Sequence, residues 1–345
     1  MKIAVIGAGS WGTAISGVAA AKASEVMLWS HDEPVPPSIN ERHVNPLYLT
    51  DYTLPKNVRA TCSFEEALDG AAGAIVVVPS PFIRSTIRSA ARYVADDLPI
   101  LCLTKGIEPH TGKLMHEVIA EELGRPERIA ALTGPNHAEE ICRGKVAAAV
   151  IASETPQVGE FFKELLISPS FRLYASNDMV GIETCGAVKN VIAIACGIAA
   201  GAGYGDNTLA LIMTRGLAEI SRIVCARGGD PMTCMGLAGM GDLVATCTSP
   251  HSRNRSFGVA FAGGESLEHY QGRTHMIVEG AAAVQSTAEL ARSLGVDAPI
   301  TFVLESLLYN NMTLDEALKL SKPLKDMYES DEKVKNLIDT ARALE

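Results

Sequence analysis

Residues 1–14 read MKIAVIGAGSWGTA, and this stretch decides the fold of the first part of the chain. The apolar run Lys2–Ile6 favours a β-strand, and the small residues after the glycines favour a helix. A strand, the pattern G-x-G-x-x-G and a helix, in that order, are typical of a dinucleotide-binding turn. Gly7 would allow the tight turn, Gly9 would let a pyrophosphate approach the backbone, and Gly12 would let the helix pack closely on the strand. The pattern predicts a nucleotide site, although purely structural glycine turns share it.

Composition indicates a globular protein of about two domains. The chain has 345 residues, of which 47% are hydrophobic and 20% charged, and its net charge is −10. An acidic chain lacks the basic surface of a general nucleic-acid binder, but it is compatible with a local basic pocket for a phosphorylated small molecule. The eight cysteines form neither a C-x-x-C pair nor a metal-ligand spacing, so we expect no metal site and a reducing, cytoplasmic location.

Neither a signal peptide nor a membrane span is expected. The first predicted strand starts directly after Met1, which leaves no room for a signal peptide. The longest apolar segment, 188–202, contains two glycines, has Lys189 at its start and is too short to cross a bilayer. We expect it to form a buried helix, without membrane insertion.

Up to about residue 177, short strands alternate with helices, which predicts a doubly wound parallel sheet of the Rossmann type. The three prolines at positions 34, 36 and 37 are expected to interrupt any helix after the second strand, and 40–55 to form a loop. The predicted strands are 2–6, 25–29, 74–78, 99–104, 129–132, 146–152 and 171–174, and the predicted helices are 64–68, 81–94, 115–123 and 156–166.

Three polar residues, Ser80, Lys105 and Asn136, follow three of these strands. Ligands of doubly wound sheets lie beyond the carboxyl ends of the strands. We therefore expect the three side chains at the same edge of the sheet as the glycine loop.

Beyond residue 178 the strand signals nearly vanish. A domain boundary is predicted near Asn177, between a dinucleotide-binding domain (1–177) and an all-helical substrate-binding domain (178–345) with a peripheral tail at 326–345. The predicted helices are 179–202, 207–227, 252–261, 280–294 and 301–309.

Lys189 and Asn190 lie within an otherwise apolar helical segment, GAVKNVIAI (186–194). Burial lowers the pKa of a lysine, so Lys189 could accept a proton. The alternative is that Lys189 extends from the edge of its helix into water.

Two further clusters carry polar residues. GMGDLVATC (239–247) presents Asp242 and Thr246 after a glycine turn, although Asp242 could also simply cap the following helix. SRNR (252–255) places a guanidinium and free N–H groups at a helix start, which suits a phosphate, although a solvated basic turn would look the same. Together the clusters predict a base, a phosphate site and a nicotinamide site, where the cofactor supplies the hydride chemistry.

These segments resemble those of bacterial NAD(P)-dependent glycerol-3-phosphate dehydrogenases. The resemblance implies NADPH or NADH as cofactor and reversible conversion of dihydroxyacetone phosphate into sn-glycerol 3-phosphate for glycerophospholipid synthesis by a cytoplasmic homodimer. It extends from residue 2 to about 325 and rests on GAGSWGTA (7–14), VVVPS (76–80), TKG (104–106), GPNHAEE (134–140), GAVKNVIAI (186–194), TRGLAE (214–219), GLAGMGDLVATC (236–247), SRNRSFG (252–258) and VEG (278–280).

The resemblance also implies a role for individual residues. Lys189 would be the proton acceptor, Lys105 and Asp242 would be catalytic with it, and the like charge of Arg253 is expected to lower the pKa of Lys189. The substrate would be bound by Lys105, Gly134, Asn136, Lys189, Asn190, Asp242, Thr246, Ser252, Arg253 and Asn254, the last three at its phosphate. The cofactor would be bound by Gly7, Gly9, Ser10, Trp11, Gly12, His31, Lys105, Ala138, Arg253, Ile277 and Glu279.

The sequence departs from the family pattern in several places. Asn136 stands where Ser or Thr is usual, but an amide still donates a hydrogen bond. The prolines after Asp32 predict a shortened helix or a loop on the adenosine side. Arg42 is the nearest candidate partner for a 2′-phosphate, and His31 could meet either a 2′-phosphate or a ribose hydroxyl, so NADPH use is expected and NADH stays open.

Two other functions remain as alternatives. A two-domain dehydrogenase for hydroxyacids, nucleotide sugars or hydroxyacyl thioesters would share the glycine loop, but should lack 252–254 combined with 186–190. A sensor that binds NAD(P) without turnover has no need of a base, so Lys189, Asp242 and Arg253 argue against it.

Overall fold

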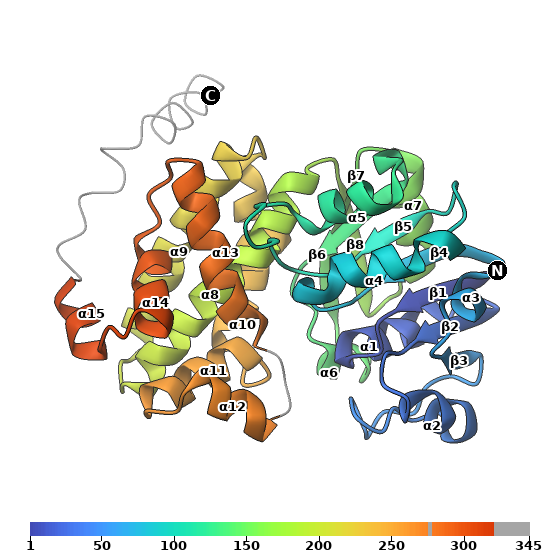
Figure 1. The fold of residues 1–345 in the computed structure, drawn as a ribbon, viewed down its shortest axis with the longest axis horizontal. Helices are drawn as coiled ribbons and strands as arrows, with labels where there is room; N and C mark the ends of the chain where they lie inside the picture. The colour runs from blue at the N-terminus through green and yellow to red at the C-terminus, as the bar shows by residue number, and fades with distance from the viewer. Residues whose placement is uncertain (275–277, 321–345) are drawn as a thin grey trace. The chain divides into compact units, whose positions relative to one another are not determined.

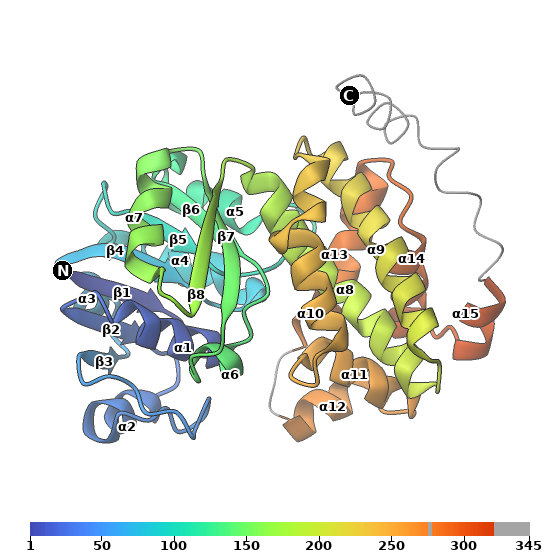
Figure 2. The same cartoon turned by 180° about the vertical axis from the view of Figure 1, so that it is seen from behind.

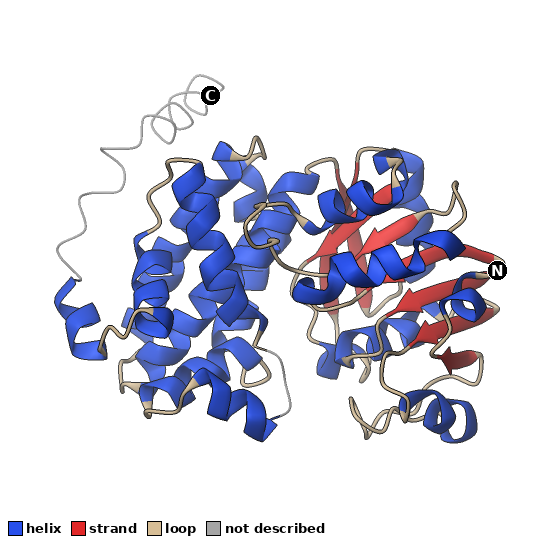
Figure 3. Ribbon diagram, viewed as in Figure 1, coloured by secondary structure: helices blue, strands red, loops and turns tan. Residues whose placement is uncertain are grey.

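The computed structural model describes residues 1–274 and 278–320. The chain forms two compact units, Met1–Leu304 and Glu305–Glu345. The change from strands to helices falls between Ser176 and Met179, inside the first unit (Figure 3). The domain boundary near Asn177 therefore stays a prediction.

The first unit contains an eight-stranded sheet with the order β3-β2-β1-β4-β5-β6-β7-β8 (Figure 1). The chain first builds β2 and β3 on one side of β1 and then returns to add β4 on the other side, which is the crossover that creates a ligand crevice in doubly wound sheets. The predicted Rossmann-type sheet is confirmed, and β3 is an addition to the predicted strands. The strands are β1 (Lys2–Ile6), β2 (Glu25–Trp29), β3 (Val58–Thr61), β4 (Ala71–Val76), β5 (Ile100–Cys102), β6 (Ile129–Thr133), β7 (Ala147–Ser153) and β8 (Phe171–Ser176).

The sheet was predicted to be parallel throughout, but β7 departs from this arrangement. β7 runs antiparallel to β6, with Ala131 opposite Ala152, whereas β7 and β8 are parallel. A parallel return usually needs a helix that crosses the face of the sheet. Only the four-residue helix α6 (Ala138–Ile141) lies between β6 and β7, so the chain turns back at the same edge.

Helices cover both faces of the sheet (Figures 1 and 2). Alternate residues of β1 enter two cores, as the two-residue period of a strand requires. Ile3 packs in one core with Phe162, and Ile6 packs in the other with Ile83. The first face carries α1 (Ser10–Ala19), α6 and α7 (Pro156–Leu166), and the second carries α3 (Phe64–Leu68), α4 (Ile83–Ala90) and α5 (Met115–Leu123).

The proline-rich segment after β2 forms a helix, α2 (Val35–Arg42), where an interruption was predicted. Pro36 and Pro37 lie in the first turn of α2. The first N–H groups of a helix have no partner within it, so prolines there remove no hydrogen bond and already hold a helical φ angle. The prolines therefore start this helix.

The second part of the first unit is helical and surrounds α8 (Met179–Gly201) (Figure 2). By length and composition α8 could span a membrane, but 83% of its most apolar window is buried inside the protein, which agrees with the predicted buried helix. The other helices are α9 (Asp206–Ala226), α10 (Asp242–Thr248), α11 (Arg253–Ala262), α12 (Leu267–Thr274) and α13 (Glu279–Ser293), followed by α14 (Pro299–Tyr309), which enters the second unit, and α15 (Leu314–Leu320) within it.

Two glycines bring α11 into backbone contact with α8. A Cβ atom on Gly197 would lie 2.1 Å from the Arg255 carbonyl oxygen, and one on Gly258 would lie 2.3 Å from the Ile194 carbonyl oxygen. Neither position can hold a side chain without separating the helices. This close crossing fixes the start of α11 near the middle of α8.

Glu219 on α9 is a buried carboxylate that holds the start of α14. It accepts hydrogen bonds from the backbone N–H groups of Ile300 (2.6 Å) and Thr301 (3.3 Å) and from the Thr301 hydroxyl (3.1 Å). Burial raises its pKa to about 7, although these hydrogen bonds favour the charged form. The folded protein therefore binds a proton that the unfolded chain has released between pH 4.5 and 7, so this group costs stability as the pH rises through that window.

We expect Glu219→Gln to remove that loss. The free energy of unfolding of the variant should exceed that of the parent by about 2–3 kcal/mol at pH 8 and match it near pH 4. Urea unfolding across this pH range is the measurement, with exposed Glu164→Gln as the control that leaves the pH dependence unchanged. A constant difference at all pH values would contradict the assigned titration.

Candidate active site

The glycine loop between β1 and α1 can hold a pyrophosphate. Gly7 has a φ angle of 118°, and a Cβ atom there would lie 2.7 Å from the Val77 carbonyl oxygen. A Cβ atom on Gly9 would meet nothing within 4 Å, so the space in front of this residue is open. Gly9 caps α1 without a side-chain hydrogen bond, which leaves the first N–H groups of the helix available to an anion. The residues therefore fit a bound dinucleotide.

Asn45 holds the following loop against the glycine loop, a role that the sequence interpretation missed. Its Nδ2 donates to the Ala8 carbonyl oxygen (2.9 Å) and to Thr13 Oγ1 (2.8 Å), and its Oδ1 accepts from the N–H groups of Leu47 and Tyr48. The only sequence signal was the pair Asn45-Pro46, which is typical of a turn. The four hydrogen bonds fix the shape of the loop that faces the glycines.

A carboxylate between two lysines forms the charged centre of the site. Asp242 Oδ2 accepts from Lys105 Nζ at 2.7 Å, and its Oδ1 accepts from Lys189 Nζ, which also donates to Thr246 Oγ1 at 2.7 Å. Lys189 is 5% exposed and Asp242 2% exposed. Lys189 therefore does not extend into water, and the Asp242 carboxylate does not cap α10. Both of these alternatives, an exposed lysine and a helix cap, are therefore wrong.

The three charged residues come from separate elements. Lys189 lies in the middle of α8, Asp242 is the first residue of α10, and Lys105 lies in the connection between β5 and α5. A Cβ atom on Gly186, one turn before Lys189, would lie 2.9 Å from Thr133 Cγ2 at the end of β6. The small residue lets α8 approach the carboxyl edge of the sheet, so Lys189 meets Lys105 there.

Lys189 and Asp242 each shift the pKa of the other. Burial lowers the pKa of Lys189 to about 8, Asp242 opposes this, and the like charge of Lys105 adds to it. Lys105, rather than the predicted Arg253, supplies that like charge. Burial opposes ionisation of Asp242, but the two lysines outweigh it and lower the pKa of this carboxyl.

The segment after β6 brings further polar atoms to the lysines. Lys105 Nζ lies 3.4 Å from the Gly134 carbonyl oxygen and 3.5 Å from Asn136 Oδ1. Asn136 Nδ2 is buried and has no hydrogen-bond partner among the described residues. Such a donor is costly unless a ligand accepts from it. Ala138, another predicted site residue, is the buried first residue of α6.

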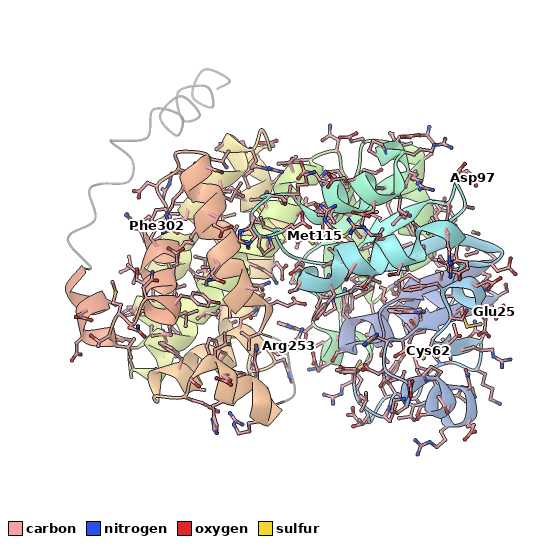
Figure 4. All side chains as sticks on the ribbon, in the orientation of Figure 1. Glu25, Cys62, Asp97, Met115, Arg253 and Phe302 are labelled. Atoms are coloured by element: carbon pink, nitrogen blue, oxygen red, sulfur yellow. The ribbon has the colours of Figure 1, made fainter. Side chains whose placement is uncertain are left out.

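Asn254 brings the starts of two helices together beside α8. Its Oδ1 accepts from the Gly280 N–H at 2.9 Å, which joins the first turns of α11 and α13. A Cβ atom on Gly280 would lie 2.9 Å from the Asn190 carbonyl oxygen. Ser252 caps α11 by accepting from the Arg255 N–H at 3.3 Å, and Arg253 is exposed in its first turn (Figure 4). The cluster therefore offers the guanidinium of Arg253, which has no ion pair among the described residues, and helix N–H groups, as a phosphate requires.

The residues expected near the adenosine of the cofactor, His31 and Arg42, are held by fewer contacts. His31 is exposed after β2, and the guanidinium of Arg42 donates to Ser38 Oγ at 2.9 Å. Burial and the charge of Asp32 raise the pKa of the Tyr48 hydroxyl, while the Arg253 charge lowers it, so Tyr48 lies within electrostatic reach of both. Tyr48 was not among the predicted site residues.

The structure places some of the remaining predicted site residues and does not describe the others. Ser10 is the first residue of α1, Trp11 packs edge-on against Phe171, and Glu279 is the first residue of α13. Ile277 and the tail 326–345 lie outside the described residues. No group of three or more His, Cys, Asp or Glu side chains suited to a metal occurs in the described part of the chain.

We expect Asp242→Asn to destabilise the protein by about 3–5 kcal/mol, because the buried ammonium of Lys189 and the partly buried ammonium of Lys105 lose their counter-charge. The pKa of Lys189 should fall below about 8, since its only stabilising charge is removed. Urea unfolding and NMR titration of the lysine side chain are the measurements. Thr246→Val is the matched control, with a smaller loss of about 1–2 kcal/mol for a hydroxyl that accepts from Lys189 and donates to the Asp242 carbonyl oxygen. Equal losses in both variants would contradict the ionic bridge.

Known proteins resemble this chain over most of its length. The models for the N-terminus and the C-terminus of NAD-dependent glycerol-3-phosphate dehydrogenase match residues 2–159 and 178–319. The glycerol-3-phosphate dehydrogenase [NAD(P)+] of Shouchella clausii is 42% identical over 314 residues, 90% of this chain and 92% of the relative. That of Corynebacterium diphtheriae is 46% identical over 303 residues, 87% of this chain and 92% of the relative.

A solved structure agrees with these matches. The crystal structure of glycerol-3-phosphate dehydrogenase from Coxiella burnetii has a TM-score of 0.89 and 36% identity, and the match covers 93% of this chain and 99% of that one. The chain therefore belongs to the NAD-dependent glycerol-3-phosphate dehydrogenase family, oxidoreductases whose cofactor is NAD or NADP.

Proposed function

We propose that this chain catalyses reversible hydride transfer between NAD(P)H and dihydroxyacetone phosphate, which yields sn-glycerol 3-phosphate. The observation that carries the proposal is the buried Lys189, held by Asp242 and Thr246 and with a pKa lowered to about 8. A group that is to exchange a proton with an alcohol near neutral pH works best with a pKa near the operating pH. Family membership supports the same reaction.

Lys189 Nζ is the proposed proton donor and acceptor at C2 of the substrate. In the direction of reduction, charged Lys189 polarises the carbonyl group and then donates a proton to its oxygen. In the direction of oxidation, neutral Lys189 accepts the hydroxyl proton. When bound in front of the glycine loop, NAD(P)H supplies the hydride. Because the pKa of Lys189 is about 8, reduction should slow and oxidation should accelerate as the pH rises through 8.

The polar residues around this lysine are proposed to hold the rest of the substrate. Lys105 and the unpartnered Nδ2 of Asn136 would bind the substrate oxygens on the sheet side. Arg253 and the first N–H groups of α11 would bind the phosphate on the helical side, with Asn190 nearby. Arg253 also lies within electrostatic reach of Tyr48, which supports a second contact with the cofactor.

The cellular role is proposed from family resemblance. We infer a cytoplasmic homodimer that supplies sn-glycerol 3-phosphate for glycerophospholipid synthesis, using NADPH or NADH. Sedimentation equilibrium tests the dimer, and parallel titrations of NADH and NADPH decide the preferred cofactor.

We expect Lys189→Met to lower kcat for the reduction of dihydroxyacetone phosphate by about 10³-fold, because no other group replaces the proton donor. Binding of NADPH, measured by fluorescence titration, should change little, since the proposed contact of Lys189 is with the substrate. Oxidation of NADPH is followed by absorbance. Near-normal turnover in this variant would remove Lys189 from its role, and no turnover by the parent chain with either cofactor would reject the substrate.

We expect Arg253→Gln to raise the KM for dihydroxyacetone phosphate by about 10–100-fold, the loss of one charge-assisted bidentate contact. The KM for dihydroxyacetone itself, which has no phosphate, should not change. Arg255→Gln, two residues further along α11, is the matched control. Equal effects on both substrates would show that Arg253 does not bind the phosphate.

A further inference from the structure

Glu183 is a second buried charge on α8, and the proposed reaction does not use it. Only 4% of its side chain is exposed. It accepts from the backbone N–H of His116 with both oxygens (3.2 and 3.3 Å), and its Oε2 lies 2.5 Å from His116 Nδ1. His116 is the second residue of α5, so a carboxylate from α8 both caps α5 and pairs with a side chain in its first turn.

The His116–Glu183 pair and the cluster of Lys105, Lys189 and Asp242 both connect α8 to the part of the chain that runs from β5 into α5. Glu183 precedes Lys189 by six residues of α8, roughly 9 Å along the helix axis. Lys105 lies in the connection that leads from β5 into α5, and His116 lies in the first turn of α5. Polar side chains therefore attach α8 to this part of the chain at the His116–Glu183 pair and again where both lysines contact Asp242.

The surroundings of the pair are rigid and apolar. Met115, labelled in Figure 4 at the first residue of α5, shares a hydrophobic core with Met179 and Ile182 of α8. Burial raises the pKa of the Cys102 thiol at the end of β5, and the Glu183 charge raises it further, which places the carboxylate close to the strand that leads to Lys105. A shift of Glu183 would thus move the strand end and the helix together.

We propose that His116 and Glu183 are a positioning pair, which sets the distance between Lys189 and Lys105 and thereby the environment of the proposed proton donor. The proposal rests on the proposed role of Lys189. Without the pair, α8 loses a polar attachment to the start of α5, which directly follows the connection that carries Lys105. Water then enters around Lys189, and the burial and like charge that lower its pKa both weaken.

The charge state of the pair follows from the groups that face His116. Burial lowers the pKa of His116, but Glu183 of α8 outweighs it, with smaller contributions from Glu117 of α5 and Glu154 before α7, so the pKa is raised. Cys102 of β5 faces Glu183 from the other side. A raised histidine pKa means that the pair contributes its full stability below about pH 6.5 and loses it as the pH rises through the raised value.

The test is the pH dependence of kcat for oxidation of sn-glycerol 3-phosphate in four variants. We expect His116→Ala and Glu183→Ala to move the rise near pH 8 upward by about half a pH unit or more, with kcat at pH 7.5 lowered by about threefold or more and KM nearly unchanged. Glu183→Gln keeps an acceptor for the His116 N–H and serves if the alanine variants do not fold. The double variant His116→Gln/Glu183→Gln replaces the ion pair by an amide pair and should restore the parent position of the rise.

Thermal unfolding supplies the second readout. The Tm advantage of the parent over the double Gln variant should shrink between pH 6 and pH 8, because only the parent has the positive charge of His116 to lose as the pH rises. Glu121→Gln, which removes two partly exposed ion pairs of the same helix, with Arg84 and Lys113, is the matched control and should shift neither the rate profile nor this difference.

The outcomes separate the two proposals. A lowered Tm with an unmoved rise in the alanine variants would show a purely structural pair and overturn the inference. Failure of the double Gln variant to restore the profile would also overturn it. If the parent shows no rise near pH 8, the proposed role of Lys189 fails instead, independently of the pair.

Discussion

The bridge from Asp242 to Lys105 and Lys189 is the interaction on which the site depends. The Lys189 ammonium and the Asp242 carboxylate are almost fully buried, and the partly exposed ammonium of Lys105 joins them from the side of the sheet. Charges in such a place must be paired, because desolvation of an isolated charge costs several kcal/mol. Asp242 pairs both lysines at once, so α8, α10 and the β5–α5 connection must meet at this point for the chain to fold.

Small residues make that meeting sterically feasible. Gly186 lets α8 approach the end of β6, Gly197 and Gly258 let α11 touch α8, and Gly280 lets α13 begin beside Asn190. Each of these positions would place a Cβ atom at or below 2.9 Å from a neighbouring atom. The glycines of the segments 186–194, 252–258 and 278–280 are therefore as important to the site as the polar residues next to them.

The sequence alone predicted the elements that local patterns specify and missed those that tertiary contacts specify. The helices Phe64–Leu68, Met115–Leu123 and Pro156–Leu166 were predicted with the bounds that the structure has. The antiparallel β7 was not predictable, because strand direction depends on whether the connection crosses the sheet. The cation that helps to lower the pKa of Lys189 was another such case. Lys105 is distant from Lys189 in the sequence, and nothing local distinguishes it from Arg253.

The charges at the site also suit the proposed substrate. The whole chain carries −10, yet Lys105 and Lys189 place two positive charges on a single carboxylate, Asp242, and the exposed Arg253 adds a third at the start of α11. A phosphate monoester carries roughly −1.5 to −2 at neutral pH, which would balance the excess. Because the lysines already share their counter-ion, an added phosphate need not break an existing ion pair. The second lysine on this one carboxylate therefore both helps to lower the pKa of Lys189 and leaves an excess of positive charge, which suits the proposed phosphorylated substrate better than an uncharged alcohol.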